Sequence, residues 1–212
     1  MRAGEEVVAP YLGVRPELVW EEKFWLLLLN AGTSLASVRR YIKLNPARKV
    51  WKTEHSDMFV RHEHVRAKAL DPAFNWTAIG NLSLLASPFM LDVRLTRKKT
   101  LDEHMPEILH ILELARQGMV PVCGFISPGE RELQRLLRLD PYARWIKTVP
   151  YGLPPRFDPS VEDSRYLAAG RQLYLSSFDN NVPQTPINYD NCHLMNDRNA
   201  AMCTRARVHK VV

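Results

Sequence analysis

The chain has 212 residues, of which 46% are hydrophobic and 25% are charged. This length and composition suit a globular protein with a sizeable core, and they exclude a disordered chain, a collagen-like repeat and a small disulfide scaffold. The longest apolar run, residues 24–29, is too short to cross a bilayer, and the first residues lack the pattern of a signal peptide. Three cysteines without CxxC spacing fit a reducing compartment. We therefore expect a cytoplasmic protein without membrane contact.

The formal net charge of +6 is concentrated in one segment, residues 36–70. That segment holds three acidic residues against nine basic ones: Arg39, Arg40, Lys43, Arg48, Lys49, Lys52, Arg61, Arg66 and Lys68. A local excess of positive charge is typical of a protein with a polyanionic partner. A solvated surface is the alternative interpretation, and the sequence leaves both open.

In the first third of the chain, the pattern predicts helices over residues 16–30 and from Ser34 to Asn45, where Pro46 follows. Residues 47–78 show no period and are expected to form a linking segment. Further on, apolar runs predict strands over 89–95, 120–123, 143–149 and 172–176.

Helices are expected between and after these strands, over 100–118, 130–139 and 190–204. Thr100 with Glu103 and Ser127 with Glu130 have the spacing of capping boxes. Alternating strands and helices predict an α/β fold, a Rossmann-like and mostly parallel sheet with flanking helices, preceded by a small helical amino-terminal segment. The expected domains are a basic helical segment with its linker over 1–72 and the α/β domain over 73–212.

The most informative segment is VPVCGFISPGERELQRLL, a strand, a loop and a helix that begins near Ser127. Gly124 and Gly129 have the spacing of a phosphate-binding P-loop, but Glu130 and Arg131 replace its lysine and its hydroxyl residue. Nucleotide hydrolysis of the P-loop kind is therefore not expected. Either the loop only caps a helix, or it contacts a small phosphorylated ligand whose charge is neutralised by cations that follow the neighbouring strand. In the second case the ligand-binding residues are Arg97, Lys98, Gly124, Phe125, Ile126, Ser127 and Gly129, and a nucleotide is the one cofactor considered.

Three strings resemble the Rossmann-type domain of the DprA/Smf DNA-processing proteins over residues 78–178. They are GFISPGE, the string PYGLPPRF over 150–157, and AGRQLYLSS over 169–177. This resemblance implies membership of the SLOG class of nucleotide- or nucleic-acid-binding domains. The chain lacks the glycine-rich second loop of the DNA-processing members, so handling of single-stranded DNA does not follow directly.

Residues 16–52 resemble the carboxyl end of the catalytic domain of REP-associated tyrosine transposases. The likeness lies in EEKFW over 21–25 and in VRRYIKLNPAR over 38–48, where Tyr41 takes the place of the DNA-attacking tyrosine. No histidine pair of the family's metal-binding type precedes Tyr41. We therefore expect no strand transfer and no catalytic residue, with Tyr41 as the candidate if that chemistry is retained. The nucleic-acid-binding candidates are Arg39, Arg40, Lys43, Arg48, Lys49 and Lys52.

The remaining histidines and cysteines do not form a motif typical of a metal site. His62 and His64 flank a charged Glu63 and are expected to be exposed, and the cysteines are expected to be buried, so no metal site is predicted. Three functions remain: a transposase-derived nucleic-acid-binding protein, a nucleotide-sensing or nucleotide-processing Rossmann domain, and a protein-interaction subunit. The sequence does not predict the oligomeric state.

Overall fold

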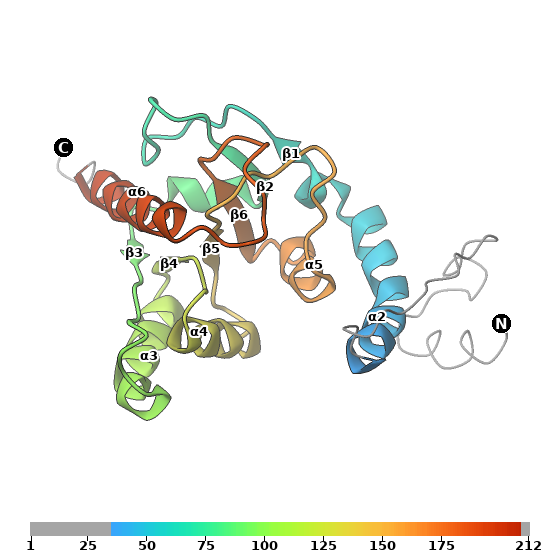
Figure 1. The fold of residues 1–212 in the computed structure, drawn as a ribbon, viewed down its shortest axis with the longest axis horizontal. Coiled ribbons are helices and arrows are strands. Elements are labelled where there is room, and N and C mark those ends of the chain that lie inside the picture. Colours follow the sequence, from blue (N-terminus) through green and yellow to red (C-terminus); the bar gives the residue numbers. More distant parts are fainter. Residues whose placement is uncertain (1–34, 209–212) are drawn as a thin grey trace, which may run out of the picture.

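A six-stranded sheet forms the centre of the fold (Figure 1). The computed structural model describes residues 35–208, and within them the side chains of Arg39 and of 42–206. The predicted helix over 16–30 and the predicted cap at Ser34 lie outside the described residues. Within the described part, no helix is long and apolar enough to cross a membrane.

The sheet has the order β1-β2-β6-β5-β4-β3. Its strands are β1 (Arg61–His62), β2 (Thr77–Gly80), β3 (Met90–Asp92), β4 (Val120–Cys123), β5 (Trp145–Thr148) and β6 (Gln172–Ser176). The last four run parallel, whereas β2 pairs antiparallel with β6 and β1 antiparallel with β2. The α/β fold with a mostly parallel sheet is thereby confirmed, including the four predicted strands.

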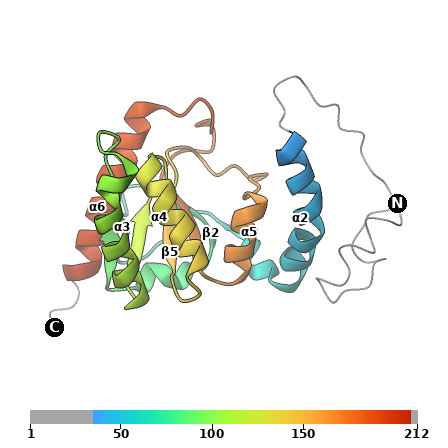
Figure 2. The ribbon, with the colours of Figure 1, turned by 90° about the horizontal axis from the view of Figure 1, so that it is seen from below.

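Helices cover both faces of the sheet. They are α3 (Leu101–Arg116), α4 (Pro128–Leu139) and α5 (Val161–Ala168) on one face, and α6 (Tyr189–Val208) with the short helix η3 (Leu82–Ala86) on the other (Figures 1 and 2). The first three share a face because β3 to β6 are added side by side in one direction, and crossovers between parallel strands are right-handed. Both predicted capping boxes are present, at Thr100 with Glu103 and at Ser127 with Glu130.

Helix α2 (Leu35–Glu54) differs from the prediction, because it continues through Pro46 instead of ending before it. A proline inside a helix removes one backbone hydrogen bond and crowds the preceding turn. Here Pro46, Ala47 and Arg48 are buried against α5, so tertiary packing outweighs the local preference. The expected linking segment over 47–78 was also wrong, since it contains the end of α2, β1 and part of β2. Helix α5 was not predicted.

Arg48 joins α2 to the start of α5. Its guanidinium donates from Nε to Ser164 Oγ over 3.2 Å and from Nη2 to the carbonyl of Pro159 over 3.1 Å, and it pairs with Asp158. Lys52 Nζ lies 2.8 Å from the same Asp158 carboxylate. These contacts hold α2 against the sheet domain through charged groups.

A buried ion cluster then joins α5 to α4 and to the sheet. Asp163 is 1% exposed and contacts Arg138 Nη2 at 2.7 Å, Lys147 Nζ at 2.9 Å and the Tyr174 hydroxyl. Burial by itself would raise the pKa of Asp163. The charges of Lys147 and Arg138 and the hydrogen bond from Tyr174 outweigh burial, and they hold the pKa well below its usual value.

Replacement of Asp163 by Asn should destabilise the fold by about 3 kcal/mol, because it leaves Lys147 and Arg138 without their buried counter-charge. The lowered pKa means that the ionised carboxylate contributes stability above about pH 4, and that this contribution is lost as the pH falls further. Urea unfolding between pH 7 and pH 3 should therefore show an acid-dependent loss in the wild type that is smaller in D163N. Equal slopes for the two proteins would contradict this role.

Gly152 lies where the segment after β5 passes the segment after β6. A Cβ atom at this position would lie 2.1 Å from the Asp179 carbonyl oxygen and 2.6 Å from the Asn180 Cα. The Gly152 N–H also donates to the Val182 carbonyl over 3.1 Å. Because the clash is with backbone, the two segments must separate if the side chain grows.

Gly152→Ala should therefore lower the unfolding free energy by about 2 kcal/mol or more. Gly118→Ala is the matched control, since its φ of +95° strains an alanine but no atom lies within 4 Å of its Cβ. Thermal or urea unfolding should place the control much nearer the wild type, with a cost of about 1 kcal/mol. An equal loss in both variants would show that crowding at Gly152 is unimportant.

Candidate nucleic-acid interface

Three segments of the chain meet at the carboxyl end of β3. Helix α3 leaves β3 on one face of the sheet, whereas α6 packs against β3 and β4 from the opposite face. Ligands of open α/β sheets bind outside the carboxyl ends of the strands. Here the segments are residues 93–99, the Gly124 loop (residues 124–127) and the first turns of α6, which contact one another, and we call the place where they meet the crevice.

Glu130, in the first turn of α4, holds two of these segments together. Its Oε2 accepts the backbone N–H groups of Ile126 and Ser127 over 2.8 and 3.1 Å. Its Oε1 accepts the N–H of Leu95, beyond β3, over 3.3 Å. In return, the Glu130 N–H donates to Ser127 Oγ over 3.2 Å. One carboxylate therefore closes the α4 cap and fixes the segment after β3 beside the segment after β4.

This arrangement bears on the predicted ligand role of the Gly124 loop. The N–H groups of Ile126 and Ser127 point at the Glu130 carboxylate, and that of Phe125 donates to Cys123 Sγ. Met195 of α6 covers Gly124, so that its Cε would lie 2.5 Å from a Cβ at that position. Phe125, Ser127 and Gly129 are buried. A phosphate could reach these donors only after Glu130 had moved away, and ligand contact by the loop stays a prediction.

The cations after β3 form the basic turn, residues 94–99. Arg94 is held by Asp92 and by the Asn196 carbonyl of α6. Arg97 and Lys98 are exposed, and neither forms an ion pair with any described residue. Burial raises the pKa of the Cys192 thiol in the first turn of α6, whereas the charge of Arg97 lowers it. Arg97 and Lys98 follow Leu95, whose N–H donates to the same Glu130 carboxylate as the Gly124 loop, and their role in ligand binding stays a prediction.

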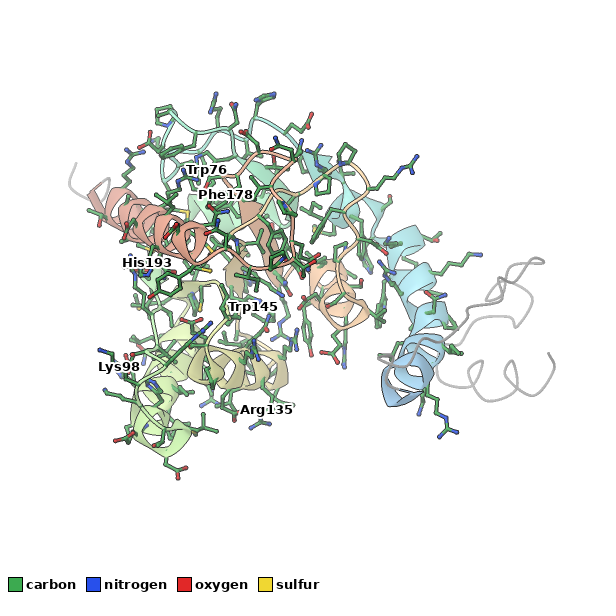
Figure 3. The ribbon with its side chains drawn as sticks, in the orientation of Figure 1. Trp76, Lys98, Arg135, Trp145, Phe178 and His193 are labelled. Carbon is green, nitrogen blue, oxygen red and sulfur yellow. The ribbon has the colours of Figure 1, made fainter. Side chains whose placement is uncertain are left out.

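Two aromatic rings on the first turns of α6 border the same crevice. Tyr189 is 72% exposed, and its ring centroid lies 4.5 Å from that of the exposed His193 in an edge-to-face arrangement. Figure 3 shows His193 on α6 and Lys98 by the start of α3. A hollow of about 590 Å³ adjoins Tyr189 and is lined by neutral residues: Asn181, Val182, Pro183, Pro186, Asn188 and Asn191. Sequence reasoning missed these residues, because segment 179–188 has no period and shows no motif.

Arg198, in the middle of α6, joins that helix to the segment after β6. It donates to the carbonyl and hydroxyl oxygens of Ser177 over 3.0 and 2.7 Å. Its guanidinium also stacks on Phe74 at 4.0 Å and on Phe178 at 4.8 Å from the ring centroids. Tyr189 and His193 therefore belong to a helix that these contacts hold against the rest of the protein.

The α2 part of the basic segment, residues 36–54, lies elsewhere, since α2 packs on α5 at the end of the molecule remote from β3 and α6 (Figure 1). Arg39, Lys43 and Lys49 are exposed. Arg48 is buried, Lys52 binds Asp158, and Arg61 and Arg66 donate to backbone carbonyls. The side chains of Arg40 and Tyr41 lie outside those described. The predicted nucleic-acid-binding residues on α2 and the Gly124 loop do not share one face.

Among the described residues, no group of three or more His, Cys, Asp or Glu side chains is placed to hold a metal ion. Cys123 and Cys203 are buried and Cys192 is half-buried. His62 is half-buried and His64 is exposed, with His64 Nδ1 lying 3.2 Å from Asn75 Oδ1.

Comparison with known proteins gives one informative likeness. No protein-family model matches the sequence, and no curated protein matches it. The fold is similar to that of DNA processing protein A from Helicobacter pylori, whose structure was described for its single-stranded DNA binding mode. The TM-score is 0.52 and the identity 20%, with 69% of this chain and 67% of that chain covered. The likeness places the chain among proteins with the Rossmann-like fold of DNA processing protein A.

Replacement of Glu130 by Ala should lower the unfolding free energy by about 2 kcal/mol, because three backbone N–H groups lose their acceptor at once. Glu132→Ala is the matched control on the same helix, since Glu132 pairs with the exposed Arg135 at the surface and should cost below about 0.5 kcal/mol. Hydrogen exchange should additionally show faster exchange at Leu95, Ile126 and Ser127 in E130A alone. Unchanged protection there would contradict the assigned role of Glu130.

Proposed function

We propose that this protein binds single-stranded nucleic acid across the crevice at the carboxyl end of β3. The observation that carries the proposal is that two kinds of exposed group, cations and rings, occur on segments that border the crevice. Arg97 and Lys98 supply positive charge on one side of the first turns of α6, and Tyr189 with His193 supplies exposed rings. Nucleic-acid phosphates are attracted to the two cations, and unpaired bases stack on the exposed rings.

The fold supports the same function. DNA processing protein A from Helicobacter pylori binds single-stranded DNA, and the present chain shares its Rossmann-like architecture. The neutral hollow beside Tyr189 suits a base, because asparagine amides can donate to and accept from base edges. Assignment to the SLOG class is part of this proposal.

The other functions have less support. A nucleotide at the Gly124 loop must compete with the Glu130 carboxylate, which is anionic and already occupies the loop donors. Descent from a transposase rests on the resemblance over 16–52, much of which precedes the described residues. If the chain has that origin, its exposed Arg39 and Lys43 would form a second and separate contact surface.

The double variant R97E/K98E tests the proposal. It should weaken binding of a fluorescent dT20 oligonucleotide by at least about tenfold at moderate salt, because two phosphate contacts become repulsive. The slope of log K against log salt should fall by roughly 1 to 1.5 units, since each lost contact on a single strand removes about 0.7. Y189A should weaken binding with a smaller change in slope, because stacking releases no counterion. Fluorescence anisotropy over a salt series measures all three proteins.

The double variant R39E/K43E is the control, because it makes the same change of charge on exposed positions of α2. It should keep most of the affinity. If R39E/K43E abolishes binding and R97E/K98E does not, the contact surface is α2 and the crevice proposal fails. Absence of binding by the wild type would also refute it.

A further inference from the structure

The amino-terminal edge of the sheet, opposite the crevice, carries a separate groove. It has a volume of about 590 Å³ and lies between residues 65–69 and the segment that contains η3. Ala206, near the end of α6, closes it. The floor is made of aliphatic and small side chains: Val65, Ala67, Leu82, Leu85, Ala86 and Pro88. Its size falls within the range of ligand-binding clefts.

The charged residues that line this groove are both cations. Arg66 and Lys68 are exposed and line it, and no acidic residue does. A second hollow of about 500 Å³ shares Ala86 and Ser87 with the groove and adds Arg144 and Arg116, of which Arg116 pairs with Asp140 and Glu113. The two together make a furrow with an aliphatic floor and a cationic rim along this edge.

The backbone beside the groove suits an extended partner. Residues 65–67 form no helix and no strand, and Val65 donates to the Trp76 carbonyl on the side facing the sheet. The backbone N–H groups of Arg66, Ala67 and Lys68 donate to no other described residue. An extended peptide laid along this segment can accept from such groups while it places alternate side chains into the groove.

We propose that this furrow binds an extended acidic peptide of a partner protein. Aliphatic side chains of the peptide lie on the floor, and its carboxylates lie at Arg66 and Lys68. Charge complementarity selects an acidic partner. The aliphatic floor of the larger groove favours a peptide over a nucleic acid, because bases stack on aromatic rings and the one aromatic lining residue of the furrow, Tyr142, belongs to the second hollow. The site lies at the opposite edge from the nucleic-acid crevice and does not depend on it.

Selection from a random heptapeptide display library on the immobilised full chain tests the proposal. Enriched peptides should combine at least two Asp or Glu residues with aliphatic residues. The best of them, synthesised with a fluorophore, should bind with an affinity that falls as salt rises. K68E and A86E should each weaken it at least tenfold, the first by charge and the second by filling the groove. Both positions are exposed, so both variants should keep the wild-type melting temperature.

K43E is the matched control, because it makes the same change of charge on α2 and should leave peptide binding unchanged. R97E/K98E should also leave it unchanged, which separates this groove from the nucleic-acid crevice. The proposal is overturned if no acidic peptide is enriched, if enriched peptides lack acidic residues, or if K68E and A86E bind them as tightly as the wild type does. Competition of the selected peptide by dT20 would indicate a nucleic-acid surface and would also overturn it.

Discussion

The Glu130 carboxylate collects backbone N–H groups from two different strand ends, and the geometry of the crevice depends on this. In many α/β proteins such donors face a bound anion at a helix amino terminus. Here the anion is the side-chain carboxylate of Glu130. The ends of β3 and β4 are therefore held at a fixed spacing without a ligand, and the exposed cations after β3 point outward. The crevice can then recognise a partner through side chains, whereas the loop backbone is already satisfied.

Charged groups also set the architecture at the other end of the sheet. Part of the positive charge of the segment over 36–70 is used in contacts within the protein, where Arg48 and Lys52 pair with Asp158 and Arg61 donates to the Leu153 carbonyl. The buried carboxylate of Asp163 joins α5 to α4 and to the sheet, because it pairs with Arg138 and Lys147. Net charge along the sequence is therefore a poor measure of the surface charge. The exposed cations at the crevice, Arg97 and Lys98, come from a short turn outside the segment over 36–70.

Local chemistry made much of the fold predictable. The strands over 120–123 and 172–176 and the caps at Thr100 and Ser127 follow from apolar runs and capping residues, which act within a few positions. The continuation of α2 through Pro46 was not predictable, because burial against the distant α5 decides it. At the site, Arg97 and Lys98 could be placed near Gly124 by strand order alone. The aromatic pair on α6 could not, since its position depends on the long segment after β6 and on the contacts of Arg198.

The most direct test of the central claim is a map of the contact itself. Ultraviolet cross-linking of the full chain to a dT20 oligonucleotide that carries 5-bromodeoxyuridine, followed by mass spectrometry of the peptides, locates the bases without any substitution. The crevice predicts cross-links at Tyr189 or His193 and within the neighbouring peptides over 94–99 and 189–198. Cross-links confined to α2, or spread evenly over the surface, would contradict the account.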